Sequence, residues 1–298
     1  MTVAIIGDIH GNLDALTRLI ESKEVSPVGH LIFLGDYIGK GRNSKEVIDF
    51  LLELSRERKC TFLLGNHEVM LMSLLRCNPV QWSLSHPRFL MRTYHQSMVE
   101  SCENLYLAHS SNGFIPLADS YGLDFTDLMI NDDEENFQAI LERKRKEWIR
   151  MIPKNHLRFF LGLLWWYYIP GFVMVHAGLS AEALSCDTFR KALTTNFELN
   201  PSSFILERET EGTPKKFPEV LVHGHTPLLV MARYYPDCPY ALDYWKQGRP
   251  KEWMGKLCID TAAFALDGYL TAFLPDSNEF IQVPAFPDDK ETDFDLMV

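Results

Sequence analysis

The chain repeats one local pattern, a short apolar run followed directly by side chains that can bind a metal. Five such runs, at residues 3–6, 31–34, 61–64, 172–175 and 220–222, are followed by GDIHG, GD, GNHE, HAG and HGHT. Short apolar runs bounded by glycine are typical of buried strands. Open α/β sheets bind their ligands just beyond the carboxyl ends of their strands. The pattern therefore predicts that five strand ends converge on one site.

Helices are predicted between the first three runs. Residues 12–20 place leucine and isoleucine at helical intervals, and Asn43 followed by Glu46 is typical of a helix start. The order strand, helix, strand, helix, strand predicts a parallel sheet covered by helices, so the expected fold class is α/β. Residues 68–160 are expected to be mostly helical. Further strands are expected at residues 257–259 and 269–273.

Composition restricts the possible functions. The chain has 298 residues, of which 46% are hydrophobic, which is enough for one large domain with a sizeable core. Its net charge of -11 argues against stable binding to nucleic acid, whose phosphate backbone attracts basic surfaces. The six cysteines form no C-x-x-C pair, so we expect reduced cysteines and a cytoplasmic protein. Because a strand is predicted from residue 3, we expect no signal peptide.

One segment is as hydrophobic as a membrane helix. Residues 159–175 carry no charge, but Pro170 and Gly171 divide this run into two pieces. Each piece is too short to cross a bilayer, which needs about 20 apolar residues in a helix. We therefore expect a buried helix end, a turn and a core strand here, and no membrane span.

The residues after the five runs combine carboxylate, amide and imidazole groups. The candidate metal ligands are Asp8, His10, Asp36, Asn66, His176 and His225. Mixed oxygen and nitrogen ligands suit manganese, iron or zinc, and two such ions about 3.5–4 Å apart can hold a phosphoryl group and generate hydroxide. Each residue alone is more often a cap, a turn or a core histidine, but their shared position favours a metal site. The other histidines are expected to be structural or on the surface: His30, His86, His95, His109 and His156.

The five motifs also resemble those of a known family. GDIHGN, GDYIGKGRNS, LLGNHE, VHAGL and HGHTP, in this order, are similar to the motifs of calcineurin-like metallophosphoesterases, and most of all to those of bacterial phosphoprotein phosphatases. The resemblance runs from residue 3 to about residue 274. It implies a single metallophosphoesterase domain over residues 1–298, with two central β-sheets flanked by helices.

The resemblance also implies a helical cap inserted in this domain. Residues 112–122 (NGFIPLADSYG) are similar to a cap element of the bacterial proteins. This similarity implies an insertion at residues 78–111, within a helical cap over about 78–160. The acidic end of the chain, from about 285 to 298, is expected to be a loose tail.

The roles of the site residues follow from the same resemblance. Asp8 and His10 are expected to bind a first metal, Asp36 to bridge two metals, Asn66, His176 and His225 to bind the second, His67 to be the general acid, and Lys40 and Arg208 to contact the phosphate. The expected cofactors are two divalent ions, manganese first, with iron or zinc as alternatives. The expected partner is a phosphorylated substrate, a protein or a nucleotide. Hydroxide would attack phosphorus in line while the general acid protonates the leaving oxygen.

The second motif departs from the phosphoprotein phosphatase pattern. That family usually reads Gly-Asp-x-x-Asp-Arg-Gly, whereas this chain has Gly39 and Lys40 in place of the second Asp and the Arg. The missing Asp normally orients the general-acid histidine, and lysine replaces a bidentate fork by a point charge. A neutral residue followed by lysine resembles the diadenosine-tetraphosphatase-like (ApaH-like) phosphatases. Their phosphoanhydride substrates have better leaving groups and need less help from a general acid.

Three functions remain open at this point. The first is a phosphatase acting on phosphoserine or phosphothreonine in proteins. The second is a hydrolase of phosphoanhydrides, such as diadenosine tetraphosphate or polyphosphate, or a phosphatase of phosphotyrosine and other aryl phosphates. The third is a binding module that keeps the metals but has lost turnover. Residues 78–111 and 234–253 are expected to shape the entrance to the site.

Overall fold

The computed structural model describes residues 2–75, 114–124, 134–200, 202–207, 214–234, 244 and 247–286. The predicted insertion at residues 78–111, Arg208 and all but the first two residues of the predicted acidic tail lie outside these ranges. Most of the aromatic-rich segment at residues 234–253 also lies outside them.

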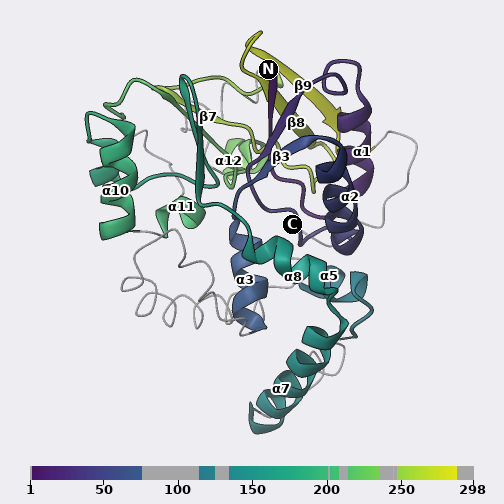
Figure 1. Ribbon diagram of the computed structural model, residues 1–298. Helices are drawn as coiled ribbons and strands as arrows, with labels where there is room; N and C mark the ends of the chain where they lie inside the picture. Colours follow the sequence, from purple (N-terminus) through teal and green to yellow (C-terminus); the bar gives the residue numbers. More distant parts are fainter. Residues whose placement is uncertain are drawn as a thin grey trace.

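Two β-sheets form the centre of the molecule (Figure 1). The first sheet has the strand order β3-β2-β1-β8-β9. Its strands are β1 (Val3–Ile6), β2 (His30–Phe33), β3 (Lys59–Phe62), β8 (Tyr269–Leu274) and β9 (Glu279–Pro284). The first three strands are parallel, and β8 and β9 join antiparallel at the side of β1. The three parallel strands therefore end at the same edge.

The second sheet has the order β4-β5-β6-β7. Its strands are β4 (Trp166–Ile169), β5 (Phe172–Val175), β6 (Val220–His223) and β7 (Lys256–Cys258). The last three strands are parallel, and β4 is antiparallel to β5. This sheet also directs the carboxyl ends of its parallel strands to one edge.

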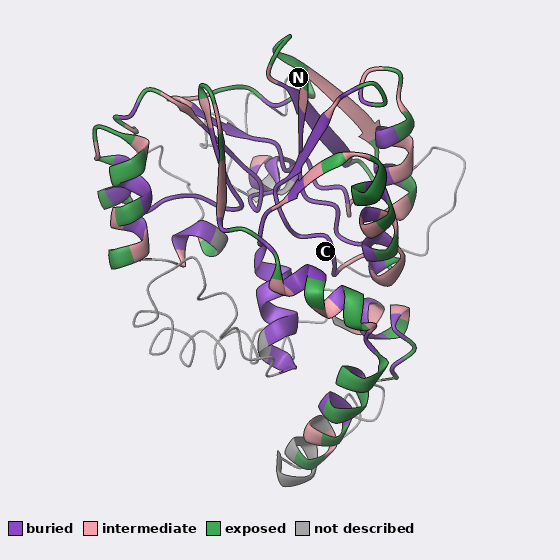
Figure 2. Ribbon diagram, viewed as in Figure 1, coloured by how far each residue is buried: buried purple, intermediate pink, exposed green. Residues whose placement is uncertain are grey.

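Alternate residues of the parallel strands are buried on opposite faces. Along β1, Ala4 and Ile6 belong to the large core that includes the flanking helices, whereas Ile5 belongs to a second core between the two sheets. Met174 and Val222 of the other sheet lie in the same second core. Because side chains alternate along a strand, this pattern buries both faces of each sheet. Figure 2 shows the inner strands as buried, β4 and β9 as mostly intermediate, and the outer helix faces as exposed.

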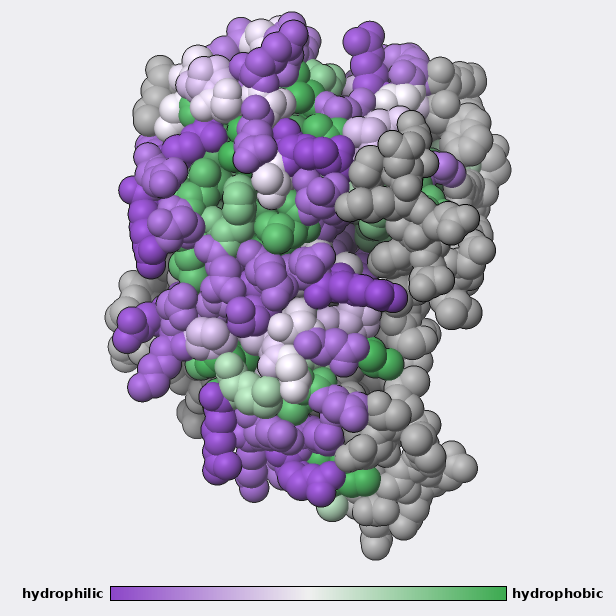
Figure 3. Space-filling view, turned by 90° about the vertical axis from the view of Figure 1, so that its right-hand side faces the viewer, coloured by the Kyte–Doolittle hydropathy of each residue, from purple (hydrophilic) through white to green (hydrophobic). Residues whose placement is uncertain are grey.

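Helices cover the outer faces of the two sheets (Figure 1). On the first sheet these are α1 (Leu13–Glu21) and α2 (Ser44–Glu57), and near the second sheet they are α9 (Ala181–Leu184), α10 (Phe189–Leu199) and α11 (Ser203–Leu206). The side chain of Asn12 caps α1 by accepting a hydrogen bond from the Ala15 N–H at 3.0 Å. The space-filling view of the side on which α1 and α2 lie shows mostly hydrophilic side chains, with apolar ones gathered between them (Figure 3).

The remaining described helices lie after β3 and after β6. They are α3 (Asn66–Leu74), α5 (Phe114–Ser120), α7 (Glu134–Met151), α8 (Lys154–Leu161) and α12 (Leu228–Tyr234). α7 extends away from the sheets (Figure 1). The described parts of residues 68–160 are thus mostly helical, as the sequence predicted. Their function as a cap stays a prediction.

Several element boundaries differ from those that the sequence predicted. The third strand covers Lys59–Phe62 rather than residues 61–64, because the pairing with β2 begins at His30 opposite Lys59. A strand in the charge-free run, β4, was missed, although the turn at Pro170 and Gly171 was predicted correctly. β9 was also missed. In the part of the chain that the structure describes, no helix has the length and hydrophobicity needed to cross a membrane.

Candidate metal centre

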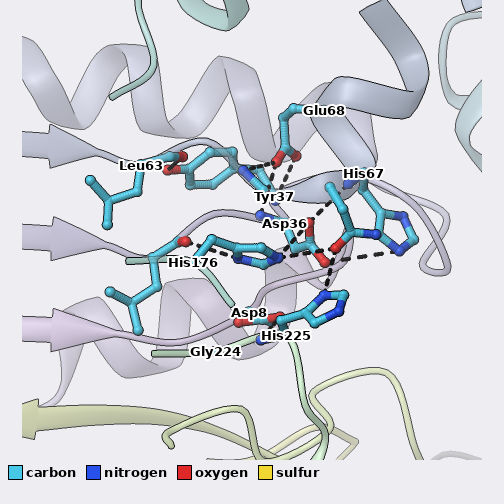
Figure 4. A network of polar contacts seen from close by, with 12 residues as sticks. Asp8, Asp36, Tyr37, Leu63, His67, Glu68, His176, Gly224 and His225 are labelled. Atoms are coloured by element: carbon cyan, nitrogen blue, oxygen red, sulfur yellow. Dashed lines mark hydrogen bonds and ion pairs between the residues drawn. The ribbon is translucent and has the colours of Figure 1, made fainter. Parts of the chain in front are cut away.

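The loops that follow five parallel strands meet at one edge of the two sheets. β1 leads to Asp8 and His10, β2 to Asp36, β3 to Asn66 and His67, β5 to His176 and β6 to His225. The structure therefore brings together all six ligand residues that the sequence predicted. Figure 4 shows the side chains of the cluster pointing toward one another around the carboxylate of Asp36.

Asp36 is the centre of this cluster. Its Oδ1 accepts a hydrogen bond from the backbone N–H of His67 at 3.0 Å and lies 3.4 Å from His176 Nε2. Its Oδ2 lies 3.7 Å from His10 Nε2 and 3.9 Å from His67 Nε2. Two groups of candidate ligand atoms share this carboxylate, one with His10 and His67, and the other with His176 and His225.

A backbone carbonyl orients the imidazole of His176. Nδ1 donates a hydrogen bond to the carbonyl oxygen of Leu34 at 3.0 Å, because a carbonyl oxygen can only accept. In the neutral ring, Nε2 then carries the lone pair, and it lies 3.0 Å from Asn66 Oδ1. Nδ1 of His225 lies 2.8 Å from the same amide oxygen. Two imidazole nitrogens thus lie against one amide oxygen, and all three are atoms of the kinds that bind metals.

Asp8 lies against the loop that carries His225. Its Oδ2 accepts a hydrogen bond from the backbone N–H of His225 at 2.9 Å. Its Oδ1 is buried and receives no hydrogen bond from the described part of the chain. A Cβ at Gly224 would lie 2.0 Å from Oδ1, so only glycine allows the loop to approach this closely. A buried carboxylate oxygen that lacks a donor is a candidate metal ligand.

Burial shifts the pKa values of Asp8, Asp36 and His10 so that the neutral form of each group is favoured. It raises the pKa of Asp8 and of Asp36 well above the usual range, with added repulsion from Asp260 for Asp8 and from Glu68 for Asp36. Burial also lowers the pKa of His10. A divalent cation among these groups would favour ionised carboxylates and neutral imidazoles. The donor atoms and their electrostatics therefore fit a bound metal.

Glu68 holds the backbone of Asp36 by a hydrogen bond, a role that the sequence analysis missed. Its fully buried carboxylate accepts hydrogen bonds from four backbone N–H groups: those of Asp36 and Tyr37 at 2.9 Å, Gly65 at 3.1 Å and Ile38 at 3.2 Å. Burial raises the pKa of Glu68 to about 7, while these bonds act in the opposite direction. The carboxylate fastens the loops after β2 and β3 to each other. Its place in GNHE, beside two site residues, was the available signal.

Four residues of the site hold strained backbone conformations. His10, Asp36, Lys40 and His225 have φ values of 51°, 51°, 54° and 63°. Residues with a Cβ rarely adopt this left-handed region, and each such residue costs about 1–3 kcal/mol when the surroundings enforce it. Among the described residues, three other non-glycine residues have a positive φ, Met254, Ala262 and Asn278, so more than half of these conformations lie in the site, as is typical of functional sites.

His67 lies in the first turn of α3, and its ring is buried beside the candidate ligands. The ring packs edge-on against His10, with centroids 4.7 Å apart and an interplanar angle of 71°. Because Nε2 is 3.9 Å from Asp36 Oδ2, the imidazole is within reach of a group bound at the cluster. Its role as a general acid stays a prediction.

Lys40 and Gly39 lie in the loop after β2. Gly39 has a φ of 88°, a conformation that an aspartate would adopt only with strain. Nζ of Lys40 lies 3.5 Å from the centroid of the Phe264 ring. The charge of Lys40 also reaches the cluster: after burial and His67, it is the next cause that lowers the pKa of His10.

Arg208, the second predicted phosphate contact, lies outside the described residues, as do His86, His95 and His109. Of the other histidines, His30 and His156 are buried and have structural partners, as predicted. His30 Nε2 lies 2.9 Å from Thr61 Oγ1. His156 lies between the Tyr121 hydroxyl and Asp49 Oδ1, each at 2.9 Å.

Comparisons with known proteins give the following matches. A model of the family described as calcineurin-like phosphoesterase matches residues 1–255. A zinc-dependent endopolyphosphatase of Saccharomyces cerevisiae is 40% identical over 70 residues, which are 22% of this chain and 21% of that protein. A Schizosaccharomyces pombe protein with the provisional name serine/threonine-protein phosphatase is 38% identical over 68 residues, 22% of each chain. The matches thus cover about a fifth of these curated relatives.

One solved structure, provisionally named a diadenosine tetraphosphatase, is similar to the whole chain. The sequence identity is 18% and the TM-score 0.47. The alignment covers 96% of this chain and 94% of that one.

Proposed function

The chain belongs to the calcineurin-like phosphoesterase family, and we propose that it hydrolyses phosphate monoesters at the cluster around Asp36, with two divalent ions bound there. The observation that carries the proposal is that Asp36 belongs to both groups of candidate ligand atoms. A carboxylate shared by two such groups supports a bridging role for Asp36 between two ions, the arrangement that many phosphatases use.

We assign the ligands as the sequence analysis did. Asp8, whose buried Oδ1 lacks a donor among the described residues, and His10 hold one ion, and Asn66, His176 and His225 hold the other. His67, which belongs to the same group of candidate ligand atoms as His10, is kept as the general acid. The hydrogen bond from His176 Nδ1 to a backbone carbonyl supports this assignment, because metal-binding histidines are usually oriented through their second nitrogen. Manganese is the first choice of metal. Zinc and iron are the alternatives, and the name of the zinc-dependent relative supports zinc.

Bound divalent ions supply a nucleophile derived from water and offset charge on the phosphoryl oxygens. His67 would then donate a proton to the leaving oxygen, since its ring is buried beside Asp36. Lys40, and Arg208 outside the described residues, would add positive charge at the equatorial oxygens. The deep burial of the cluster strengthens all of these electrostatic effects because water is excluded.

The proposed substrate is a phosphorylated serine or threonine in a protein. The order and the residues of the five motifs support this substrate, as does the phosphatase name of the S. pombe relative. The alternative substrates are phosphoanhydrides and aryl phosphates, including phosphotyrosine. Gly39 supports them, because a poorly oriented His67 slows the reaction less when the leaving group is acidic. The name of the endopolyphosphatase relative also supports phosphoanhydrides.

A substrate panel with added manganese tests the proposal. It contains phosphoserine and phosphotyrosine peptides, diadenosine tetraphosphate, polyphosphate and p-nitrophenyl phosphate, each with and without a chelator. We expect chelator-sensitive release of phosphate, fastest from the phosphoserine peptide if the first substrate class is correct. Turnover of the anhydrides alone would favour the second class. Binding of phosphate without turnover of any substrate in any metal would reject the enzyme and leave the binding module.

A further inference from the structure

Phe264 lies in the loop between β7 and β8, and its ring contacts two residues of the site. Nζ of Lys40 lies 3.5 Å from the ring centroid. The ring of His10 meets Phe264 edge-on, with centroids 5.3 Å apart and an interplanar angle of 84°. The face of an aromatic ring attracts a cation, so this ring favours one position of the ammonium group.

Lys40 precedes a close contact between two loops of the site. The N–H of Gly41 donates a hydrogen bond to the carbonyl oxygen of His10 at 2.8 Å. A Cβ at Gly41 would lie 2.5 Å from that same oxygen, so the two loops are in close contact. A lysine side chain is a flexible four-carbon stem that ends in a point charge, whereas the planar guanidinium of arginine can bind a phosphate in a defined bidentate orientation. An aromatic ring under the ammonium group supplies orientation that the lysine side chain itself does not have.

The loop that carries Phe264 provides a rigid platform. The side-chain amide of Asn12 donates a hydrogen bond to the carbonyl oxygen of Ala263 at 2.8 Å, which ties the loop to the start of α1. The N–H of Ala262 donates to Asp260 Oδ1 at 3.0 Å. These bonds fix the residues just before Phe264, and the edge contact with His10 restricts the ring itself.

We propose that Phe264 is a positioning residue, which holds the ammonium group of Lys40 where it contacts the phosphoryl oxygens of the substrate. This inference rests on the proposed function. It adds a residue from the loop after β7 to a site that is otherwise formed by the loops after the other strands. Phe264 touches neither substrate nor metal in this role and acts through Lys40. Its side chain is only half-buried, so changing it is compatible with folding.

Inhibition by inorganic phosphate at saturating manganese tests the inference. We expect Phe264→Leu, and equally Phe264→Met, to raise the inhibition constant of phosphate about 3- to 30-fold, the range that loss of a cation–π contact implies. Phe264→Tyr keeps the ring and should stay within about twofold of wild type. Phe189→Leu is the matched control, because this half-buried ring also has a cation nearby, with Arg190 Cζ 5.9 Å from its centroid. It should leave the constant unchanged.

A double variant separates an effect through Lys40 from a general disturbance. In a Lys40→Met background, adding Phe264→Leu should change the inhibition constant no further. An unchanged constant in Phe264→Leu, an equal loss in Phe264→Tyr, or an undiminished effect in the Lys40→Met background would each overturn the inference. These results would leave the proposed function standing as long as the wild type hydrolyses phosphate esters. A wild type that neither binds nor releases phosphate would reject both.

Discussion

Replacing Gly224 with alanine should disable the site without unfolding the protein. Gly224 lies between His223 and His225, and its φ is outside the left-handed region, so alanine fits the backbone there. The added Cβ would lie 2.0 Å from Asp8 Oδ1, whereas Cβ contacts in proteins are essentially never below 3.0 Å. The carboxylate of Asp8 must therefore move by about 1 Å or more.

The size of the effect follows from this displacement. Metal–ligand distances hold to within about 0.2 Å, so a shift of about 1 Å removes Asp8 as an effective ligand. Misplacement by about 1 Å costs roughly 100-fold in rate, or about 2.7 kcal/mol of transition-state stabilisation. We therefore expect kcat/KM for p-nitrophenyl phosphate to fall about 100-fold, with a manganese affinity that is lower by about 10- to 100-fold.

The assay compares Gly224→Ala with Gly162→Ala. Gly162 follows α8 with a φ of -93°, and a Cβ there would lie 3.3 Å from its nearest neighbour, so this variant makes the same chemical change without the clash. Rates are measured over a manganese titration, and melting temperatures establish that both variants fold. If Gly224→Ala keeps the rate and the manganese affinity of wild type within about twofold, Asp8 is not a ligand held by this contact.

Two further predictions concern histidines. His67→Ala should lower the rate on a phosphoserine peptide about 100-fold or more. On p-nitrophenyl phosphate the rate should fall about tenfold or less, because an aryl leaving group needs little protonation. Equal losses on the two substrates, measured side by side, would contradict the role of His67 as the general acid. His156 has a pKa lowered by burial, so the unfolded chain takes up a proton first as the pH falls below about 6.5. The free energy of unfolding, measured in urea titrations between pH 7 and 5, should then fall more steeply with decreasing pH in wild type than in His156→Gln. The difference in slope should be at most about 1.4 kcal/mol per pH unit. Parallel slopes would argue against a lowered pKa of His156.

The sequence predicted that the candidate ligand residues lie together because strand ends carry a clear signal. A four-residue apolar run followed by Gly35 and Asp36 is typical of a buried strand that ends at a binding site, and five such runs constrain one another. The parallel order of β1, β2 and β3 followed from the helices that the sequence predicts between these strands. The strands and their parallel order depend on local pattern and on general rules of sheet topology, and the structure confirms both. The role of the clustered residues as metal ligands stays a prediction.

Contacts between distant loops could not be predicted in this way. Glu68 stands beside predicted site residues, but the sequence does not show that its carboxylate turns back to the N–H groups of the β2 loop. Phe264 lies in the stretch AAFALDG, which has no pattern that points to Lys40. β4 was missed because a continuous apolar run does not distinguish a buried helix from a strand. Tertiary packing determines all three.

The most direct test of the account counts the manganese ions bound per chain by equilibrium dialysis, in wild type, in Asp36→Asn and in the exposed control Asp276→Asn. Since Asp36 is shared by both groups of candidate ligands, we expect wild type and Asp276→Asn to bind two ions. In Asp36→Asn, both ions should bind at least about tenfold more weakly, and hydrolysis of p-nitrophenyl phosphate should be lost with them. A wild type that saturates with one ion, or an Asp36→Asn variant that keeps both ions at wild-type affinity, would contradict the proposed bridge.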